Sequence, residues 1–205
     1  MPQCAGHYIM IFFILQLKYL PIYDTLCNML IPIKKILDFH QLRTQSHIDC
    51  VNYFAGLIGY HFPEHDYDKM LGTIRTGYAH AVYKKYHPEF TLTETQRELY
   101  EMVHDDHHNS QPHHLEHYQN DVSKISDMTL MEMICDWHSA SFEQRFITHE
   151  DSIGHTVYDY WSTRLHHLNW SEHQITTITE ILEFLDMYTN HNDVMKIWSP
   201  LINLT

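Results

Sequence analysis

The sequence predicts an all-α fold, a single helical bundle of about six to eight helices. Glycine is scarce at six residues and proline at seven in a chain of 205 residues. No long segment alternates polar and apolar residues, whereas apolar residues recur at helical spacing. The length fits one domain, and a hydrophobic content of 44% supplies a core and argues against extensive disorder.

The first two predicted helices follow directly from this spacing. Residues 45–59 carry one apolar stripe, made of Ile48, Val51, Phe54, Ala55 and Ile58. His47 shares the face of this stripe, so we expect it to point inward. The second helix spans about 66–86, and we expect it to end at His87-Pro88 because a residue before proline avoids helical geometry.

Three capping boxes indicate later helix starts, each with a Ser or Thr three residues before a Gln or Glu. They pair Thr93 with Gln96, Thr129 with Glu132, and Ser171 with Gln174. The first of these helices runs into a histidine-rich segment and is broken by Pro112. The second carries Asp136 at the edge of its buried face, and the third is a plain amphipathic helix.

Charge and cysteine content exclude some classes of protein. The formal net charge is -13 with neutral histidines, so the chain has no basic stripe for duplex nucleic acid. The four cysteines form no C-x-x-C pair and suit neither a zinc ribbon nor a disulfide scaffold. We expect reduced thiols in a cytoplasmic protein, acting in the host cytoplasm if the source is viral rather than bacterial.

Residues 1–32 are expected to be an apolar extension, followed by one domain over 33–205. The apolar stretch from Tyr8 to Leu17 is too short to span a membrane, and Lys18 interrupts it. The first seven residues lack the Lys or Arg of a secretory signal. A buried helix or strand, or a non-native extension, is therefore favoured over a membrane-associated segment.

The densest chemical signal is the segment 104–118, which holds six histidines in fifteen residues. Neutral imidazole is the commonest protein ligand for metals. Carboxylates, an Asn, a Pro and an aromatic residue interrupt the histidines, so the segment is not a homopolymeric tag. Its alternative interpretation is an exposed loop that binds metals adventitiously.

Further candidate ligands stand outside this segment in a defined order: His47, then His65-Asp66 with Lys69, and later Asp136. This order resembles the HD-domain superfamily of metal-dependent phosphohydrolases, and His65 to Lys69 match its HD-x-x-K variant. The resemblance implies a helical fold in which the first His, the His-Asp doublet and the last Asp bind one metal. Histidines between the doublet and the last Asp bind a second metal in dinuclear members.

A closer resemblance covers residues 36–145. The segment 107–116 has the pattern HH-x-x-x-P-HH-x-E, and 131–137 reads MEMICDW. Both are similar to an uncharacterised domain family of phages and bacteria, with an EM-x-x-DW helix after the histidines. That family implies a grouping of the site residues and no activity.

The two resemblances together imply the ligands. Metal one would be bound by His47, His65, Asp66 and Asp136, with His61 as an alternative to His47. Metal two would be bound by His108 and His113, with His107 and His114 as alternates. Asp66 is expected to bridge the metals, Lys69 to bind substrate phosphate, and Glu116 to orient a ligand or a water.

The predicted function is that of a metal-dependent phosphohydrolase acting on a nucleotide or another small phosphoester. Its cofactors would be one or two divalent ions of Mn, Fe, Zn or Mg. A di-iron HD-type oxygenase and a non-catalytic metal-binding protein use the same ligands and remain alternatives. We expect a small phosphorylated substrate and no membrane or duplex nucleic acid as partners, with homo-oligomerisation left open.

Overall fold

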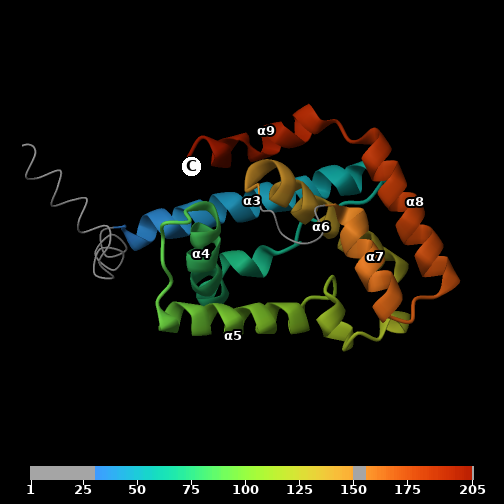
Figure 1. The fold of residues 1–205 in the computed structure, drawn as a ribbon, viewed down its shortest axis with the longest axis horizontal. Helices are drawn as coiled ribbons and strands as arrows, with labels where there is room; N and C mark the ends of the chain where they lie inside the picture. Colours follow the sequence, from blue (N-terminus) through green and yellow to red (C-terminus); the bar gives the residue numbers. More distant parts are fainter. Residues whose placement is uncertain (1–30, 150–155, 205) are drawn as a thin grey trace, which may run out of the picture.

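The computed structural model describes residues 31–149 and 156–204, and these form an all-helical bundle (Figure 1). Seven α-helices and four short 3-10 or π turns account for its elements, with no strand in the described ranges. The predicted fold class is thereby confirmed. The predicted extension, residues 1–32, lies almost wholly outside the described residues. Among those described, no helix is both long and apolar enough to cross a membrane.

Helix α3 (Ile33–Leu57) is the central element of the fold, and it packs against α4, α6 and α9 (Figure 1). The predicted stripe is confirmed from Ile48 to Ala55, where Val51 and Phe54 are fully buried. His47 lies on the same buried face, 3% exposed. The helix starts twelve residues before the predicted position and ends before Gly59, whose φ of 82° suits glycine alone.

The prediction of one continuous helix over 66–86 is wrong. A 3-10 turn, η1 (Tyr67–Met70), is separated from helix α4 (Gly72–Tyr86) by a break at Leu71. Leu71 is extended and Gly72 has φ of 50°, so the chain turns sharply between the two elements. This turn is what brings Asp66 and Lys69 to the side of α3.

Helix α5 (Glu94–Ser110) begins with the predicted Thr93–Gln96 capping box, which is confirmed by both of its hydrogen bonds. It packs tightly along α4, where a Cβ on Gly77 would lie 2.5 Å from Val103 Cγ2. Beyond the end of α5, the chain passes through η2 (Leu115–Tyr118) and η3 (Val122–Lys124).

Helix α6 (Asp127–Phe142) begins earlier than predicted, because Ser126 and not Thr129 is its N-cap. The Ser126 hydroxyl accepts from the Thr129 backbone N–H, at 3.2 Å. The predicted Thr129–Glu132 capping box is therefore wrong, and Glu132 lies in the second turn of the helix. A π turn, η4 (Glu143–Ile147), continues α6 at its C-terminal end.

The C-terminal helices cover the remaining faces of α3 and α6: α7 (Val157–His167), α8 (Glu172–Tyr188) and α9 (His191–Ile202). The capping box of Ser171 with Gln174 at the start of α8 is confirmed. The fully buried side chains here include Ile178, Leu182, Leu185 and Trp198. These contacts enclose the core on one side of α3, while α4 and η1 also pack against this helix.

Candidate metal centre

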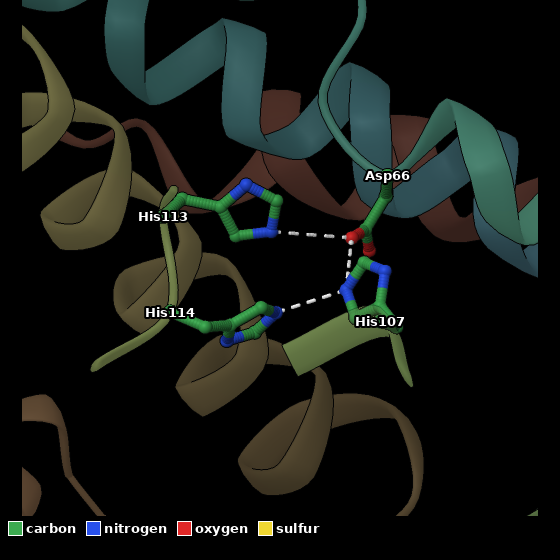
Figure 2. Close-up of side chains that lie close together, drawn as sticks. All are labelled: Asp66, His107, His113 and His114. Atoms are coloured by element: carbon green, nitrogen blue, oxygen red, sulfur yellow. Dashed lines mark hydrogen bonds and ion pairs between the residues drawn. The ribbon is translucent and has the colours of Figure 1, made fainter. Parts of the chain in front are cut away.

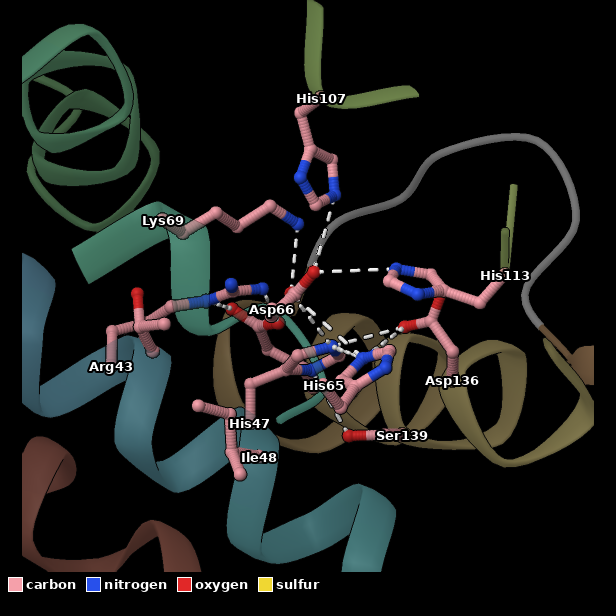
Figure 3. A network of polar contacts seen from close by, with 12 residues as sticks. Arg43, His47, Ile48, His65, Asp66, Lys69, His107, His113, Asp136 and Ser139 are labelled. Carbon is pink, nitrogen blue, oxygen red and sulfur yellow. Dashed lines mark hydrogen bonds and ion pairs between the residues drawn. The ribbon is translucent and has the colours of Figure 1, made fainter. Parts of the chain in front are cut away.

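Five parts of the chain bring histidines and aspartates to one buried place (Figure 3). They are α3, the turn before η1, the last turns of α5, the loop after α5, and the middle of α6. In chain order these parts supply His47, His65 with Asp66, His107, His113 with His114, and Asp136. Most of these side chains are buried, so water cannot satisfy their polar atoms.

Asp66 occupies the middle of the arrangement, and its backbone is left-handed, with φ of 56°. Asp tolerates this region better than most residues, but such geometry usually persists only where the surroundings require it. The turn directs the carboxylate between α3 and α5. As a result, its two oxygens face two different sets of histidines.

The first set, which we call the His47 group, contains His47, His65 and Asp66, with Asp136 against them. The Nε2 atoms of His47 and His65 are 3.4 Å apart. Asp66 Oδ2 lies 3.5 Å from His47 Nε2 and 3.9 Å from His65 Nε2. Asp136 Oδ1 lies 3.0 Å from His47 Nε2 and 3.7 Å from His65 Nε2. Asp66 and Asp136 thus both lie against the Nε2 atoms of His47 and His65.

The second set, the His107 group, contains Asp66, His107, His113 and His114 (Figure 2). Its carboxylate oxygen is Asp66 Oδ1, which lies 3.2 Å from His107 Nε2 and 3.4 Å from His113 Nε2. His114 Nε2 is 2.9 Å from His107 Nε2. Asp66 therefore presents one oxygen to each group.

The hydrogen bonds made by the outward-facing ring nitrogens determine whether the other nitrogen of each ring presents a lone pair to the centre. The Nδ1 atoms of His65 and His107 donate to Glu132 Oε1 and Asp68 Oδ2, at 3.0 and 2.8 Å. Carboxylates only accept, so each of these Nδ1 atoms carries a hydrogen. In the neutral ring, the inward Nε2 then has a lone pair, as a metal ligand requires. His47 Nδ1 similarly has a partner, the Ser139 hydroxyl, at 3.1 Å.

Glu132 serves both groups through the same oxygen. Its Oε1 accepts from His65 Nδ1 at 3.0 Å and lies 3.4 Å from His113 Nδ1. His65 belongs to the His47 group and His113 to the His107 group, and these two histidines also form a cluster with Asp136. One carboxylate on α6 therefore orients a ring in each group.

The electrostatics of the centre favour positive charge between its carboxylates. Burial lowers the pKa of His47 and His114, which keeps both imidazoles neutral. Burial also disfavours the charged form of His65, but the neighbouring carboxylates, first Asp66, outweigh it and raise its pKa to about 10. Burial would raise the pKa of Asp66 and Asp136, yet their ammonium and imidazole neighbours hold both pKa values well below the usual range.

The donor atoms fit a divalent ion. Asp66 Oδ1 and His113 Nε2 are buried polar atoms without a hydrogen-bond partner. Ligands about 2.0–2.1 Å from a tetrahedral ion are about 3.4 Å from one another, and several donor pairs have this separation. At 2.9 Å, the Nε2 atoms of His107 and His114 need a hydrogen or a cation between them, because two lone pairs repel. The buried clusters could hold a metal ion.

The structure brings together most of the predicted ligands, but not all. His47, His65, Asp66 and Asp136 meet as predicted, and the alternative to His47, His61, is exposed. Of the adjacent pair on α5, His107 faces Asp66, whereas His108 belongs to a separate group with His114 and Glu116. The choice of His108 over its alternate His107 thus does not fit the Asp66 centre.

The two predicted catalytic residues lie in different surroundings. The Lys69 ammonium donates to Asp66 Oδ2 at 2.8 Å, and its side chain is 11% exposed. Its charge therefore neutralises part of the charge of the Asp66 carboxylate. The Glu116 side chain is 41% exposed and contacts His108 Nδ1 at 3.4 Å. It forms a more exposed cluster with His108 and His114 and does not belong with Asp66.

Residues that orient the ligands were absent from the sequence-based site. Asp68, Glu132 and Ser139 each contact the outward nitrogen of a candidate ligand. A signal existed for two of them, because Asp68 lies within the HD-x-x-K segment and Glu132 within the MEMICDW segment. Nothing in the sequence distinguished a ring-orienting role from a helix cap or a surface carboxylate.

A comparison with known protein families assigns the chain to one of them. The model of the family of unknown function DUF5662 matches residues 37–198. The chain belongs to this family. The DUF5662 match includes every candidate ligand, and it extends beyond residue 145, where the sequence-based resemblance ended, through α7 and α8 into α9. No curated protein and no solved structure matches the chain.

Proposed function

We propose that this member of DUF5662 is a metal-dependent phosphohydrolase of the HD type, acting on a nucleotide or another small phosphoester in the cytoplasm. The observation that carries the proposal is Asp66, whose two oxygens face two buried histidine groups. This is the arrangement expected of a carboxylate that bridges two ions, of Mn, Fe, Zn or Mg. When bound, such a pair of ions activates water and clamps the attacking and leaving oxygens of a phosphoester.

The chain's own residues support this chemistry by orientation and charge. Glu132 and Asp68 hold His65, His107 and His113 with their Nε2 atoms inward. Lys69 places an ammonium beside Asp66, which favours an anionic substrate near the centre. Asp136, with its side chain 15% exposed, lies at the open side of the His47 group.

The experiment begins with elemental analysis of the full chain without a histidine tag. We expect bound divalent metal, and phosphate release from a panel of nucleotides and a generic phosphoester when Mn(II) is supplied. Asp66→Asn and Asp136→Asn should lower both metal content and phosphate release. His117→Ala is the matched control, since this histidine from the same segment is exposed and outside both groups.

Three outcomes would contradict the proposal. Metal content at background level would remove its basis altogether. Bound iron with oxygen uptake and no phosphate release would favour the di-iron oxygenase. Stoichiometric metal with neither reaction would favour a non-catalytic metal-binding protein.

A further inference from the structure

A second, more exposed ligand cluster lies beside the His107 group. His108, His114 and Glu116 each offer one ligand atom, and these atoms lie within 4.8 Å of one another. His108 Nδ1 is 3.4 Å from Glu116 Oε2. The rings of His108 and His114 are stacked, with centroids 3.9 Å apart and planes at 8°. Two imidazoles and a carboxylate form a donor set that suits zinc and similar divalent ions.

Solvent access differs sharply between this outer cluster and the buried centre. The side chains of Glu116 and His108 are 41% and 23% exposed, whereas those of Asp66 and His107 are 1% and 0% exposed. The outer cluster is therefore more accessible to an ion from solvent than Asp66 is. The outer cluster thus lies between solvent and the His107 group, with which it shares His114.

His114 belongs to both sets of ligands. Its Nε2 is 2.9 Å from His107 Nε2, in the buried group, while its ring stacks on His108, in the outer cluster. Imidazole has two ring nitrogens, so one side chain can serve two adjoining positions. His104, one turn before His108 on α5, stacks on His108 at 4.0 Å and extends the row of rings outward.

We propose that His108, His114 and Glu116 form an acquisition site for a divalent cation of the zinc type, from which His114 passes the ion to the His107 group. The proposal rests on the proposed metal centre and adds its route of loading. It also accounts for the position of His108 and Glu116, which contact each other and not Asp66. The outer cluster supplies three donors and is open to water, so an ion held there would keep a coordination position for water and exchange with solvent.

The test compares the rate of zinc uptake with the amount of zinc finally held. The metal-free full chain is mixed rapidly with Zn(II), and free zinc is followed with a metallochromic indicator. Charged groups that concentrate an ion locally raise its association rate by about tenfold or more. We therefore expect the double variant His108→Ala, Glu116→Gln to take up zinc about tenfold more slowly. Its zinc content after gel filtration should equal that of the unmodified protein.

The control and the contradicting outcomes separate this proposal from the proposed function. His117→Ala, in the same segment but outside both sets, should take up zinc at the unmodified rate. An unchanged rate in the double variant would overturn the acquisition site and leave the buried centre standing. A lower final zinc content in a folded double variant would also overturn it, by making His108 a ligand of the tight centre. No zinc on the unmodified chain after gel filtration would overturn the acquisition site, whereas the proposed function is overturned only by background levels of every divalent metal in the elemental analysis.

Discussion

Replacing Glu132 with Gln should weaken both metal positions at once, although this residue is not itself a candidate ligand. Glu132 Oε1 accepts from His65 Nδ1 at 3.0 Å and lies 3.4 Å from His113 Nδ1. In Glu132→Gln the carboxylate becomes a neutral amide, which can accept from one ring but no longer offers charge to two. One ring then keeps only a neutral partner and the other loses its partner, so neither Nε2 is held as firmly toward the centre.

The size of the effect follows from these two contacts. A hydrogen bond to a charged group contributes about 1.5–3 kcal/mol. Loss of a residue that orients a metal ligand typically lowers metal affinity by about 10–100-fold, which corresponds to about 1.4–2.8 kcal/mol. The two estimates agree, and the contacts reach one histidine in each group. We therefore expect each of two dissociation constants to rise by about 10–100-fold.

The assay is a competition titration of the metal-free chain against a chromogenic chelator, with circular dichroism as a check on folding. Asp68→Asn is the matched control, because Asp68 contacts His107 alone among the candidate ligands, at 2.8 Å. It should weaken only one of the two positions. The reasoning would be refuted if Glu132→Gln weakened one position only, or if Asp68→Asn weakened both.

Three further predictions concern ligand linkage, packing and pH. A divalent ion at a concentration of about 100 times its dissociation constant stabilises the fold by about 2.7 kcal/mol. This stabilisation should raise Tm by about 5–10 °C. In Asp66→Asn the rise in Tm should vanish, and an equal rise in that variant would contradict the ligand assignment. Gly77→Ala should lower the free energy of unfolding by about 1–3 kcal/mol, because the new Cβ meets Val103 Cγ2 at 2.5 Å; an unchanged urea midpoint would be incompatible with this contact. Burial would raise the pKa of Glu143, but its ion pair with Arg43 holds the pKa at about 2, below its ordinary value. The stabilisation is therefore present above about pH 5 and lost as the pH falls toward 2. In Glu143→Gln the free energy of unfolding, followed by fluorescence, should depend less steeply on pH over this range. The variant should also be less stable by about 3–5 kcal/mol at pH 7. The same pH dependence in the variant and the unmodified chain would argue against the ion pair.

Local signals in the sequence were sufficient to predict most helices and the types of residue that could bind a metal. The apolar spacing around Val51 and the capping boxes at Thr93 and Ser171 concern neighbouring residues, so they can be recognised without knowing how the helices pack. The break before α4 was missed because Gly72 was not recognised as a residue with positive φ. The helix start at Ser126 was missed because two Ser or Thr residues competed for the N-cap.

The choice between adjacent histidines had a local signal too. His107 lies four residues after the buried Val103, and His108 lies four residues after the half-exposed His104. Residues four apart share a helix face, so this spacing already favours His107 as the inward residue. The sequence-based choice of His108 did not use it.

The sequence by itself determined an all-helical chain with enough histidine and aspartate, in the right order, for a metal centre. Only the tertiary structure decided that Asp66 divides its two oxygens between two groups, and that Glu132 on α6 orients a ring in each. The physical reason is that periodicity and caps depend on residues within a turn or two of each other. The contact of His47 with Asp136 spans 89 residues, and its distance depends on how α3 and α6 pack.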